Sequence, residues 1–313
     1  MTKNKKKIII TLLAILLAIF IGFTLFIGSQ VFNGFTNMVS REETLIGEQS
    51  YEQEFEDFVK GKEVHYINFP SSKYKHNIPA LLVKQDGNKN MAVLVHGMGG
   101  TGKSLSHIMD IFLNLGYDVL AIDQRNSGNN QAPYNTFGVL ESYDILDAID
   151  IAKKEIGENG KIVLWGESYG AASSAIAAGR DDQNIDYLIL ESPLANSNEF
   201  LDEKLREIEQ KQGVPASYMK FAGNIYTMLK LHFSFDDIDA SKFIEKVSKP
   251  VLITNADKDT LTPPHMGESL YKCINHNNKE IFTAKGYKHA EFPRKESEEY
   301  KNIVANFLKK YKW

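Results

Sequence analysis

The chain has a single cysteine and no cluster of residues with the spacing of metal ligands. Cys273 is the one cysteine among 313 residues, so no disulfide bond can form within the chain. Its sequence surroundings lack the context of a catalytic thiolate, and we interpret it as a packing residue. Because histidines, cysteines and carboxylates do not cluster at metal-binding spacing, we expect no catalytic metal and no bound cofactor.

Basic charge is scarce outside the first seven residues. The chain has 36 basic and 40 acidic side chains, and four of the basic ones are Lys3, Lys5, Lys6 and Lys7. The rest of the chain therefore has 32 basic residues against 40 acidic ones. Such an acidic excess suits the phosphates of nucleic acid poorly, so we expect no nucleic-acid partner.

One long hydrophobic run follows these lysines. Ile8 to Ile27 is uncharged over twenty residues and is interrupted only by Thr11, Gly22 and Thr24. As a helix it spans about 30 Å, the thickness of the hydrocarbon core of a bilayer. A cleaved signal peptide is the alternative, but its apolar core is usually only about 7–15 residues long. We therefore expect residues 1–28 to be an uncleaved transmembrane anchor. The lysines predict a cytoplasmic N-terminus and a domain on the outer side of the cell membrane.

The remaining chain divides into a polar segment and a domain that alternates between strands and helices. We interpret residues 29–62, which are rich in Glu and Gln, as a stalk, and residues 63–313 as the domain. Residues 64–69 and 78–83 suggest an antiparallel pair of strands. Continuous apolar strands separated by amphipathic helices then predict a mostly parallel α/β sheet with helices on both faces. These strands are expected at residues 92–95, 119–122, 162–165, 188–190, 251–254 and 280–283.

One interval departs from this alternation. The sixty residues between Leu190 and Val251 contain no convincing strand, whereas residues 199–212 and 216–233 have a helical pattern. We expect a helical cap at about residues 194–246, inserted above the carboxyl edge of the sheet. Its aromatic side chains are expected to pack within the cap, although some could line an acyl pocket; they are Tyr218, Phe221, Tyr226, Phe233 and Phe235.

Two motifs give competing indications of function. Residues 97–104, GMGGTGKS, match the phosphate-binding pattern G-x-x-x-x-G-K-[ST] between a strand and a helix, which is typical of an NTPase. Residues 166–170, GESYG, match G-x-S-x-G between the strand IVLW and the helix AASSAIAAG. That context is typical of a nucleophile elbow, in which a sharp turn raises Ser168 above the sheet.

The elbow accounts for more of the sequence, because partners for Ser168 follow in the required order. A serine hydroxyl needs a base, and the base needs an anion that fixes its tautomer. Asp259 lies just after one expected strand and His289 just after the next. Asp257 is the alternative acid, but Asp259 directly precedes the Thr-Leu-Thr-Pro turn. His96 precedes the nucleophile and is interpreted as a structural loop residue.

Acyl transfer also needs backbone N–H groups that stabilise an oxyanion. One donor is expected from Tyr169, directly after the nucleophile. The other is expected from Met98, in the loop HGMGG after the strand at residues 92–95. Under this interpretation the glycines of the phosphate-loop match serve the oxyanion hole instead.

Together, strand-HGMGG, DQR, GESYG, DTLTP and the late histidine resemble the α/β-hydrolase superfamily. The resemblance extends from about Val64 to the C-terminus and is closest to a branch with monoacylglycerol lipases, proline aminopeptidase-like enzymes and membrane-anchored bacterial hydrolases. It implies a catalytic triad of Ser168, Asp259 and His289, with Met98 and Tyr169 as oxyanion donors. Two positions depart from the family pattern: residues 123–128 match its D-x-R-G-x-G-x-S only loosely, and Asn255 stands where glycine is common.

The sequence therefore predicts a membrane-anchored serine hydrolase that cleaves carboxylic esters, with a small acyl ester or lipid as substrate. A peptidase on the same fold is an alternative. Two alternatives from other classes are an NTPase and a catalytically inactive binding module.

Overall fold

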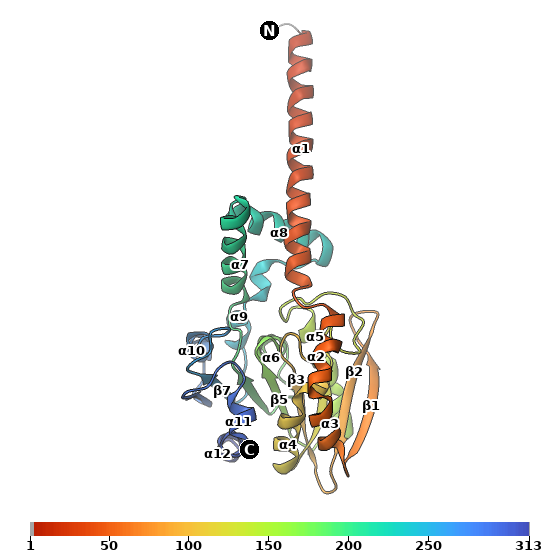
Figure 1. The fold of residues 1–313 in the computed structure, drawn as a ribbon, viewed down its shortest axis with the longest axis vertical. Coiled ribbons are helices and arrows are strands. Elements are labelled where there is room, and N and C mark those ends of the chain that lie inside the picture. Colours follow the sequence, from red (N-terminus) through yellow and green to blue (C-terminus); the bar gives the residue numbers. More distant parts are fainter. Residues whose placement is uncertain (1–2, 313) are drawn as a thin grey trace. The chain divides into compact units, whose positions relative to one another are not determined.

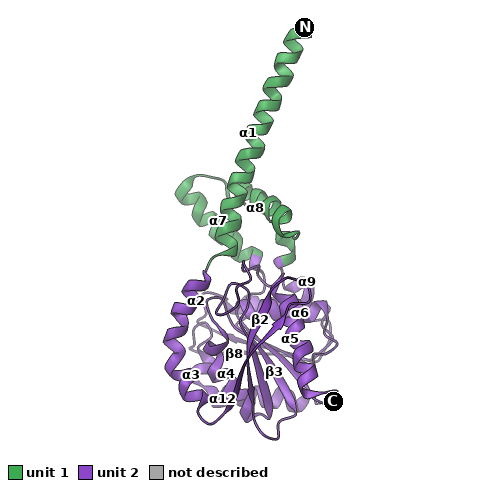
Figure 2. Ribbon diagram, turned by 90° about the vertical axis from the view of Figure 1, so that its right-hand side faces the viewer, with its two compact units in different colours: residues 1–38, 198–237 green, residues 39–197, 238–313 purple. Residues whose placement is uncertain are grey.

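The computed structural model describes residues 3–312, and its elements are shown in Figure 1. The chain forms two compact units, which are coloured separately in Figure 2. The residues up to Met38 and the segment Asn198–Asp237 form unit 1. Val39–Ser197 and the chain from Ile238 onward form unit 2.

Unit 2 is built on an eight-stranded sheet with the strand order β1-β2-β4-β3-β5-β6-β7-β8. The first two strands are antiparallel to each other, β2 is antiparallel to β4, and all later pairs are parallel. The strands are β1 (Glu63–Pro70), β2 (Asn77–Lys84), β3 (Asn90–Val95), β4 (Tyr117–Ile122), β5 (Ile162–Glu167), β6 (Tyr187–Glu191), β7 (Val251–Ala256) and β8 (Lys279–Ala284).

This sheet confirms the predicted mostly parallel α/β fold. Each apolar run that was expected to form a strand does so, and the central strands β3 to β7 are almost entirely buried. Burial on both faces is the reason why these strands are continuous apolar runs rather than alternating ones.

Helices cover both faces of the sheet (Figure 2). On one face, α3 (Glu52–Val59), α4 (Ser106–Asn114) and α12 (Ser297–Lys310) share a hydrophobic core with the strands. On the other face, α5 (Glu141–Ile156) and α6 (Tyr169–Arg180) pack against β3 and β5. Shorter helices complete unit 2: α2 (Arg41–Glu48), η1 (Gln49–Tyr51), η2 (Gly102–Leu105), α9 (Ser241–Ile244), α10 (Pro264–Cys273) and α11 (Phe292–Lys295).

Residues 29–62, expected to form a stalk, divide between the two units. Helix α1 (Lys3–Thr36) continues without a break past Ile27. Residues 41–59 form α2, η1 and α3 and pack on unit 2, where Phe55 and Phe58 are 3% and 9% exposed within its core. Helix α3 buries its apolar face against unit 2. This packing stabilises the helix, because an isolated helix of eight residues is not stable in water.

Unit 1 consists of α1 together with α7 (Ser197–Gln212), α8 (Ala216–Leu231) and part of η3 (Phe235–Ile238). Glycines allow α1 and α8 to approach closely: a Cβ atom at Gly28 would lie 2.4 Å from the Ala222 carbonyl oxygen. A Cβ atom at Gly223 would lie 2.4 Å from Val31 Cγ1. The two expected cap helices are thus present, and they form one compact unit with the apolar N-terminal helix.

Helix α1 is long and apolar enough to cross a membrane. Its large apolar side chains from Ile8 to Phe26 are 37% to 65% exposed within the described chain. Its backbone hydrogen bonds are made within the helix, as a membrane-spanning segment requires.

Candidate functional site

The GESYG motif forms a sharp turn between β5 and α6. Ser168 has φ 56° and ψ −116°, a strained conformation for a residue with a side chain. Its N–H donates to the Glu191 carbonyl at 2.8 Å, and its own carbonyl accepts from Ala172 at 3.2 Å. Hydrogen bonds on both sides therefore hold the strained residue in place.

The glycines of this motif allow the strand, turn and helix to pack closely. A Cβ atom at Gly166 would lie 2.4 Å from the Gly170 carbonyl oxygen, and one at Gly170 would lie 2.3 Å from the Val95 carbonyl oxygen. Real Cβ atoms do not come that close to backbone oxygens, so larger residues at either position would displace the elbow.

Asp259 and His289 form a direct pair at the carboxyl edge of the same sheet. Asp259 follows β7, His289 follows β8, and His289 Nδ1 lies 2.7 Å from Asp259 Oδ2. The rejected alternative, Asp257, instead accepts the Gly286 N–H at 2.6 Å. Since the carboxyl ends of parallel strands share one edge, this pair and Ser168 lie on the same edge of unit 2.

The environment of Asp259 keeps its carboxylate ionised. Burial raises the pKa of Asp259, but hydrogen bonds and the charge of His289 outweigh this effect and lower it. The backbone N–H groups of Leu261 and Thr262 both donate to Asp259 Oδ1 at 2.9 Å. An ionised carboxylate beside Nδ1 fixes the tautomer in which Nε2 is free to accept a proton.

Thr262 is a member of this cluster that the sequence did not reveal. Its hydroxyl lies 2.9 Å from Asp259 Oδ2, 3.0 Å from His289 Nδ1 and 2.9 Å from the Ser192 carbonyl oxygen. The side chain thus connects the carboxylate and the imidazole to the end of β6. The Thr-Leu-Thr-Pro turn indicated which aspartate to choose, but not that its second threonine contacts both partners.

The loop after β3 lies directly against Ser168. A Cβ atom at Gly97 would lie 3.4 Å from Ser168 Cβ and 3.2 Å from Glu167 Oε1, so a larger residue there would crowd both side chains. The Gly100 N–H donates to the Gly97 carbonyl at 3.1 Å and closes a tight turn around Met98. Tyr169, the other expected donor, is the first residue of α6, whose helix dipole favours a developing negative charge.

His96 anchors this loop. Its Nδ1 lies 2.7 Å from the Gly97 carbonyl, and the Gln124 N–H donates to its Nε2 at 3.0 Å. One ring nitrogen donates and the other accepts, so the ring is neutral. Burial lowers the pKa of His96 to about 4. Both ring nitrogens are engaged by the backbone, in agreement with a structural role.

Two carboxyl groups lie on neighbouring strands next to the site, one partly buried (Glu167) and one fully buried (Glu191). Glu167 ends β5 and is aligned with Glu191 at the end of β6. Burial raises the pKa of Glu191 to about 8, while hydrogen bonds from the Thr254 and Ser192 hydroxyls act in the opposite direction. Burial also raises the pKa of Glu167. The sequence analysis did not single out either group. Glu167 occupies the first variable position of the G-x-S-x-G motif, so the motif itself says nothing about its role.

A cavity of about 450 Å³ opens beside the loop of residues 97–100 within unit 2. Its walls include Met98, Gly99, Glu167, His289 and Arg294. This volume is within the range of about 300–1,000 Å³ that is typical of small-molecule sites.

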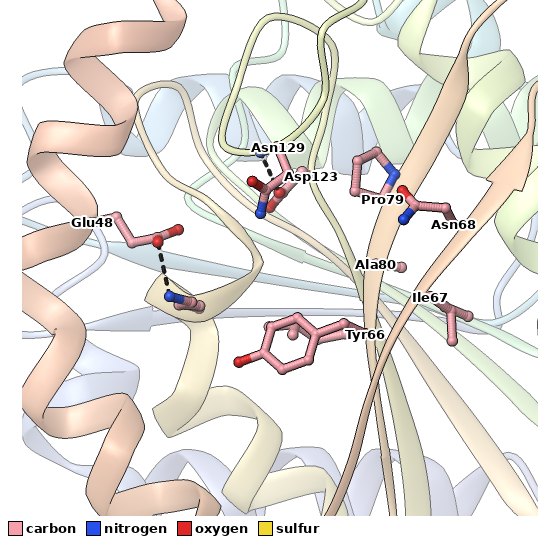
Figure 3. Close-up of a pocket in the computed structure, with 10 residues that line it drawn as sticks. Glu48, Tyr66, Ile67, Asn68, Pro79, Ala80, Asp123 and Asn129 are labelled. Carbon is pink, nitrogen blue, oxygen red and sulfur yellow. Dashed lines mark hydrogen bonds and ion pairs between the residues drawn. The ribbon is translucent and has the colours of Figure 1, made fainter.

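The phosphate-loop match does not form an anion site. The Gly102 N–H donates to Asp123 Oδ1 at 2.8 Å, and Lys103 Nζ lies 3.0 Å from Glu48 Oε1 and 3.2 Å from Glu52 Oε2. Figure 3 shows Glu48 and the Asp123–Asn129 pair at the small cavity here, whose volume is about 90 Å³. A phosphate would meet two carboxylates, Glu48 and Asp123, and find the lysine already paired.

A parallel sheet, a strained serine between strand and helix, and an Asp–His pair at the same edge define the architecture of an α/β hydrolase. Comparisons with known proteins lead to the same class. Residues 93–223 match the family described as the alpha/beta hydrolase fold. The esterase Pf2001 of Pyrococcus furiosus superposes with a TM-score of 0.64 at 20% identity, covering 82% of this chain and 94% of the esterase.

Two relatives are similar in sequence. The chain is 25% identical over 255 residues to the Bacillus subtilis protein YqkD, covering 81% of this chain and 82% of YqkD. It is 28% identical over 221 residues to the lysophosphatidylserine lipase ABHD12 of Xenopus tropicalis, covering 63% of this chain and 53% of the lipase. The chain thus spans most of YqkD but only about half of the lipase. The chain has the α/β-hydrolase fold and is similar to members of that superfamily, and these similarities support hydrolase activity.

Proposed function

We propose that the chain is a membrane-anchored serine hydrolase that cleaves acyl or lipid esters through Ser168, His289 and Asp259. The observation that carries the proposal is the 2.7 Å contact between His289 and Asp259 at the sheet edge that also carries the strained Ser168. Structural modules do not need a strained serine or a buried Asp–His pair, because both features cost stability.

The chemistry proceeds in two halves. His289 Nε2 removes the Ser168 proton while Ser168 Oγ attacks the ester carbonyl, and Asp259 stabilises the imidazolium that forms. The Met98 and Tyr169 N–H groups stabilise the oxyanion, and the proton on His289 passes to the leaving alcohol. Water then attacks the acyl-enzyme in the same way and releases the carboxylic acid.

The ester preference rests on the apolar N-terminal helix and on the relatives. A chain held at a membrane by α1 meets acyl esters at the surface of the bilayer. ABHD12 is named as a lysophosphatidylserine lipase and Pf2001 as an esterase, and both names describe ester hydrolysis. With Lys3, Lys5, Lys6 and Lys7 on the cytoplasmic side, the domain lies on the outer side of the cell membrane.

Turnover assays test the reaction class. The detergent-solubilised full chain is expected to hydrolyse p-nitrophenyl esters faster than aminoacyl p-nitroanilides. Ser168→Ala is expected to lower turnover by roughly 10³–10⁶-fold, as in other triads. Faster turnover of the anilides would favour a peptidase, and undiminished ester hydrolysis by the alanine variant would refute the role of Ser168.

A further inference from the structure

Unit 1 has a partly open apolar cavity of about 570 Å³, and its lining residues do not include the proposed triad. Its walls come from the C-terminal part of α1, from α7 and from the start of α8, all within this unit. Representative lining residues are Phe26, Val31, Phe35, Leu201, Leu205 and Ile208. Apolar surface that stays exposed on a folded chain marks a site of interaction with a ligand, a membrane or a partner. The volume suits a small molecule.

The position of the cavity along α1 indicates the chemistry of that ligand. Phe26 and Ile27 line the cavity and are also the last residues of the hydrophobic run that begins at Ile8. Helix α1 is continuous through both regions. When the run spans a bilayer, one wall of the cavity therefore lies at the level of the hydrocarbon core. Acyl chains are the apolar molecules present at that depth.

Helix α8 packs on α1 at the same level. The Tyr218 hydroxyl lies 2.8 Å from the Thr24 hydroxyl, and the Tyr218 ring stacks on Phe23 with centroids 6.1 Å apart. On the outside of α8, Phe221 and Leu229 are 55% and 65% exposed. Exposed apolar side chains on a helix that contacts the hydrophobic run are suited to lipid rather than to water.

A small number of polar side chains also reach the cavity. Gln30, Lys204 and Gln212 line it, and Lys204 Nζ is paired with Glu207 at 3.0 Å. A mainly apolar pocket with a few polar groups is typical of a site that orients an amphiphile. Gln30 lies less than one helical turn beyond the end of the hydrophobic run, at the depth of a lipid headgroup.

We propose that this cavity binds the acyl chain of a single-chain lipid taken up from the bilayer, with α1 serving as a wall of the site as well as the anchor. This proposal depends on the proposed anchoring of α1 in the membrane, but it does not depend on catalysis by Ser168. It names single-chain lipids, such as lysolipids, monoacylglycerols and fatty acids, as the class of ligand.

Photocrosslinking in nanodiscs tests the proposal without requiring catalysis. Full-length Ser168→Ala protein is loaded with palmitate that carries a diazirine on its chain, and labelled positions are mapped by mass spectrometry. Labels on Leu201, Leu205 and Ile208 of α7 are expected, because these side chains line the cavity. Labels confined to residues 8–25, which do not line the cavity, would reflect bilayer contact alone and would overturn the proposal.

Two glycines of α1 provide a matched pair of variants. A Cβ atom at Gly34 or at Gly22 meets nothing within 4 Å, but only Gly34 lines this cavity. Gly34→Phe is therefore expected to fill the cavity without a backbone clash and to lower labelling of α7 by about tenfold or more. Gly22→Phe is expected to leave the labelling unchanged. Equal effects of the two variants would contradict a specific site.

Filling the cavity from the opposite wall gives an independent check. Ile208→Trp enlarges a lining side chain of α7 and is expected to lower labelling as Gly34→Phe does, with thermal melting used to show that both variants are folded. Unchanged labelling in both folded variants would overturn the proposal. Because labelling does not require hydrolysis, loss of the proposed reaction and loss of the lipid site give separate results.

Discussion

At the scale of single residues, the hydroxyl of Thr262 determines how Asp259 and His289 meet. It contacts the carboxylate, the imidazole and the Ser192 carbonyl, and therefore fixes the geometry of the pair from a third strand. Thr260, two residues earlier in the same turn, is exposed. Thr260 and Thr262 therefore have the same side chain, but Thr262 contacts the Asp259–His289 pair whereas Thr260 faces solvent.

This difference gives a matched prediction. Thr262→Val is expected to lower kcat/KM for ester hydrolysis by about 10–100-fold, because a hydrogen bond to a charged group is worth about 1.5–3 kcal/mol. Thr260→Val is expected to leave kcat/KM unchanged. Steady-state kinetics on both variants check the prediction, and equal rates for Thr262→Val and the wild type would show that the hydroxyl does not position the pair.

Glu191 leads to a prediction about stability and pH. Burial raises the pKa of Glu191 in the folded chain to about 8, well above the ordinary value of 4.5 for an exposed glutamate. Between these values the folded state binds more protons than the unfolded state, so stability falls as pH rises. The Glu191 contribution is complete below about pH 4.5 and is lost as pH approaches 8.

Glu191→Gln removes this titration and keeps a group that can accept from the Thr254 and Ser192 hydroxyls. Its melting temperature relative to the wild type is expected to rise between pH 5 and pH 8 and then to level off. Thermal melts of the two proteins across this range measure the effect. A difference that does not change with pH would mean that Glu191 is ionised throughout.

The sequence was more informative about the strands than about the contacts of individual residues. Every run assigned to the sheet became a strand, and for the central strands β3 to β7 burial on both faces produces an unambiguous apolar pattern. The turn at Ser168 was also recoverable from local context, and the expected partners Asp259 and His289 do contact each other, although their catalytic roles stay predictions. The contacts of Thr262 and the alignment of Glu167 with Glu191 were not recoverable, because they depend on strands that are distant in sequence.

At the scale of elements, the pairing of α1 with α8 was the main feature that the sequence did not predict. Both helices were expected, but nothing local in their sequences indicates that they meet. The contact depends on small residues, Gly28 on α1 and Ala222 and Gly223 on α8, which allow the backbones to approach. A helix expected only to anchor the chain is therefore also a structural part of unit 1.

Crowding this contact is expected to destabilise unit 1. Gly28→Leu places a side chain where even a Cβ atom would lie 2.4 Å from the Ala222 carbonyl oxygen, and overpacking of this kind costs about 1–3 kcal/mol. Gly22→Leu meets open space and serves as the control. Limited trypsinolysis at Lys211 and Lys220 is expected to be faster in Gly28→Leu alone. Identical digestion of the two variants would contradict the observed packing.

At the scale of the whole molecule, the proposal places an acidic hydrolase domain outside the cell on an apolar helix. Protease added to intact protoplasts is expected to digest the domain, and alkaline carbonate is expected not to release the chain from membranes. Protection of the domain from protease would reverse the proposed topology. Recovery of a soluble form beginning near Ser29 would show that the N-terminal helix is cleaved.

The central claim is that Ser168 is an activated nucleophile, and covalent labelling tests it most directly. A fluorophosphonate reacts with an activated serine and releases fluoride, and trypsin then gives the peptide from Ile162 to Arg180. This peptide also contains Ser173 and Ser174, which are fully buried and serve as internal controls. Tandem mass spectrometry is expected to place the adduct on Ser168 and to find none in the His289→Ala variant. An adduct on another serine, or none in the wild-type protein, would contradict the account.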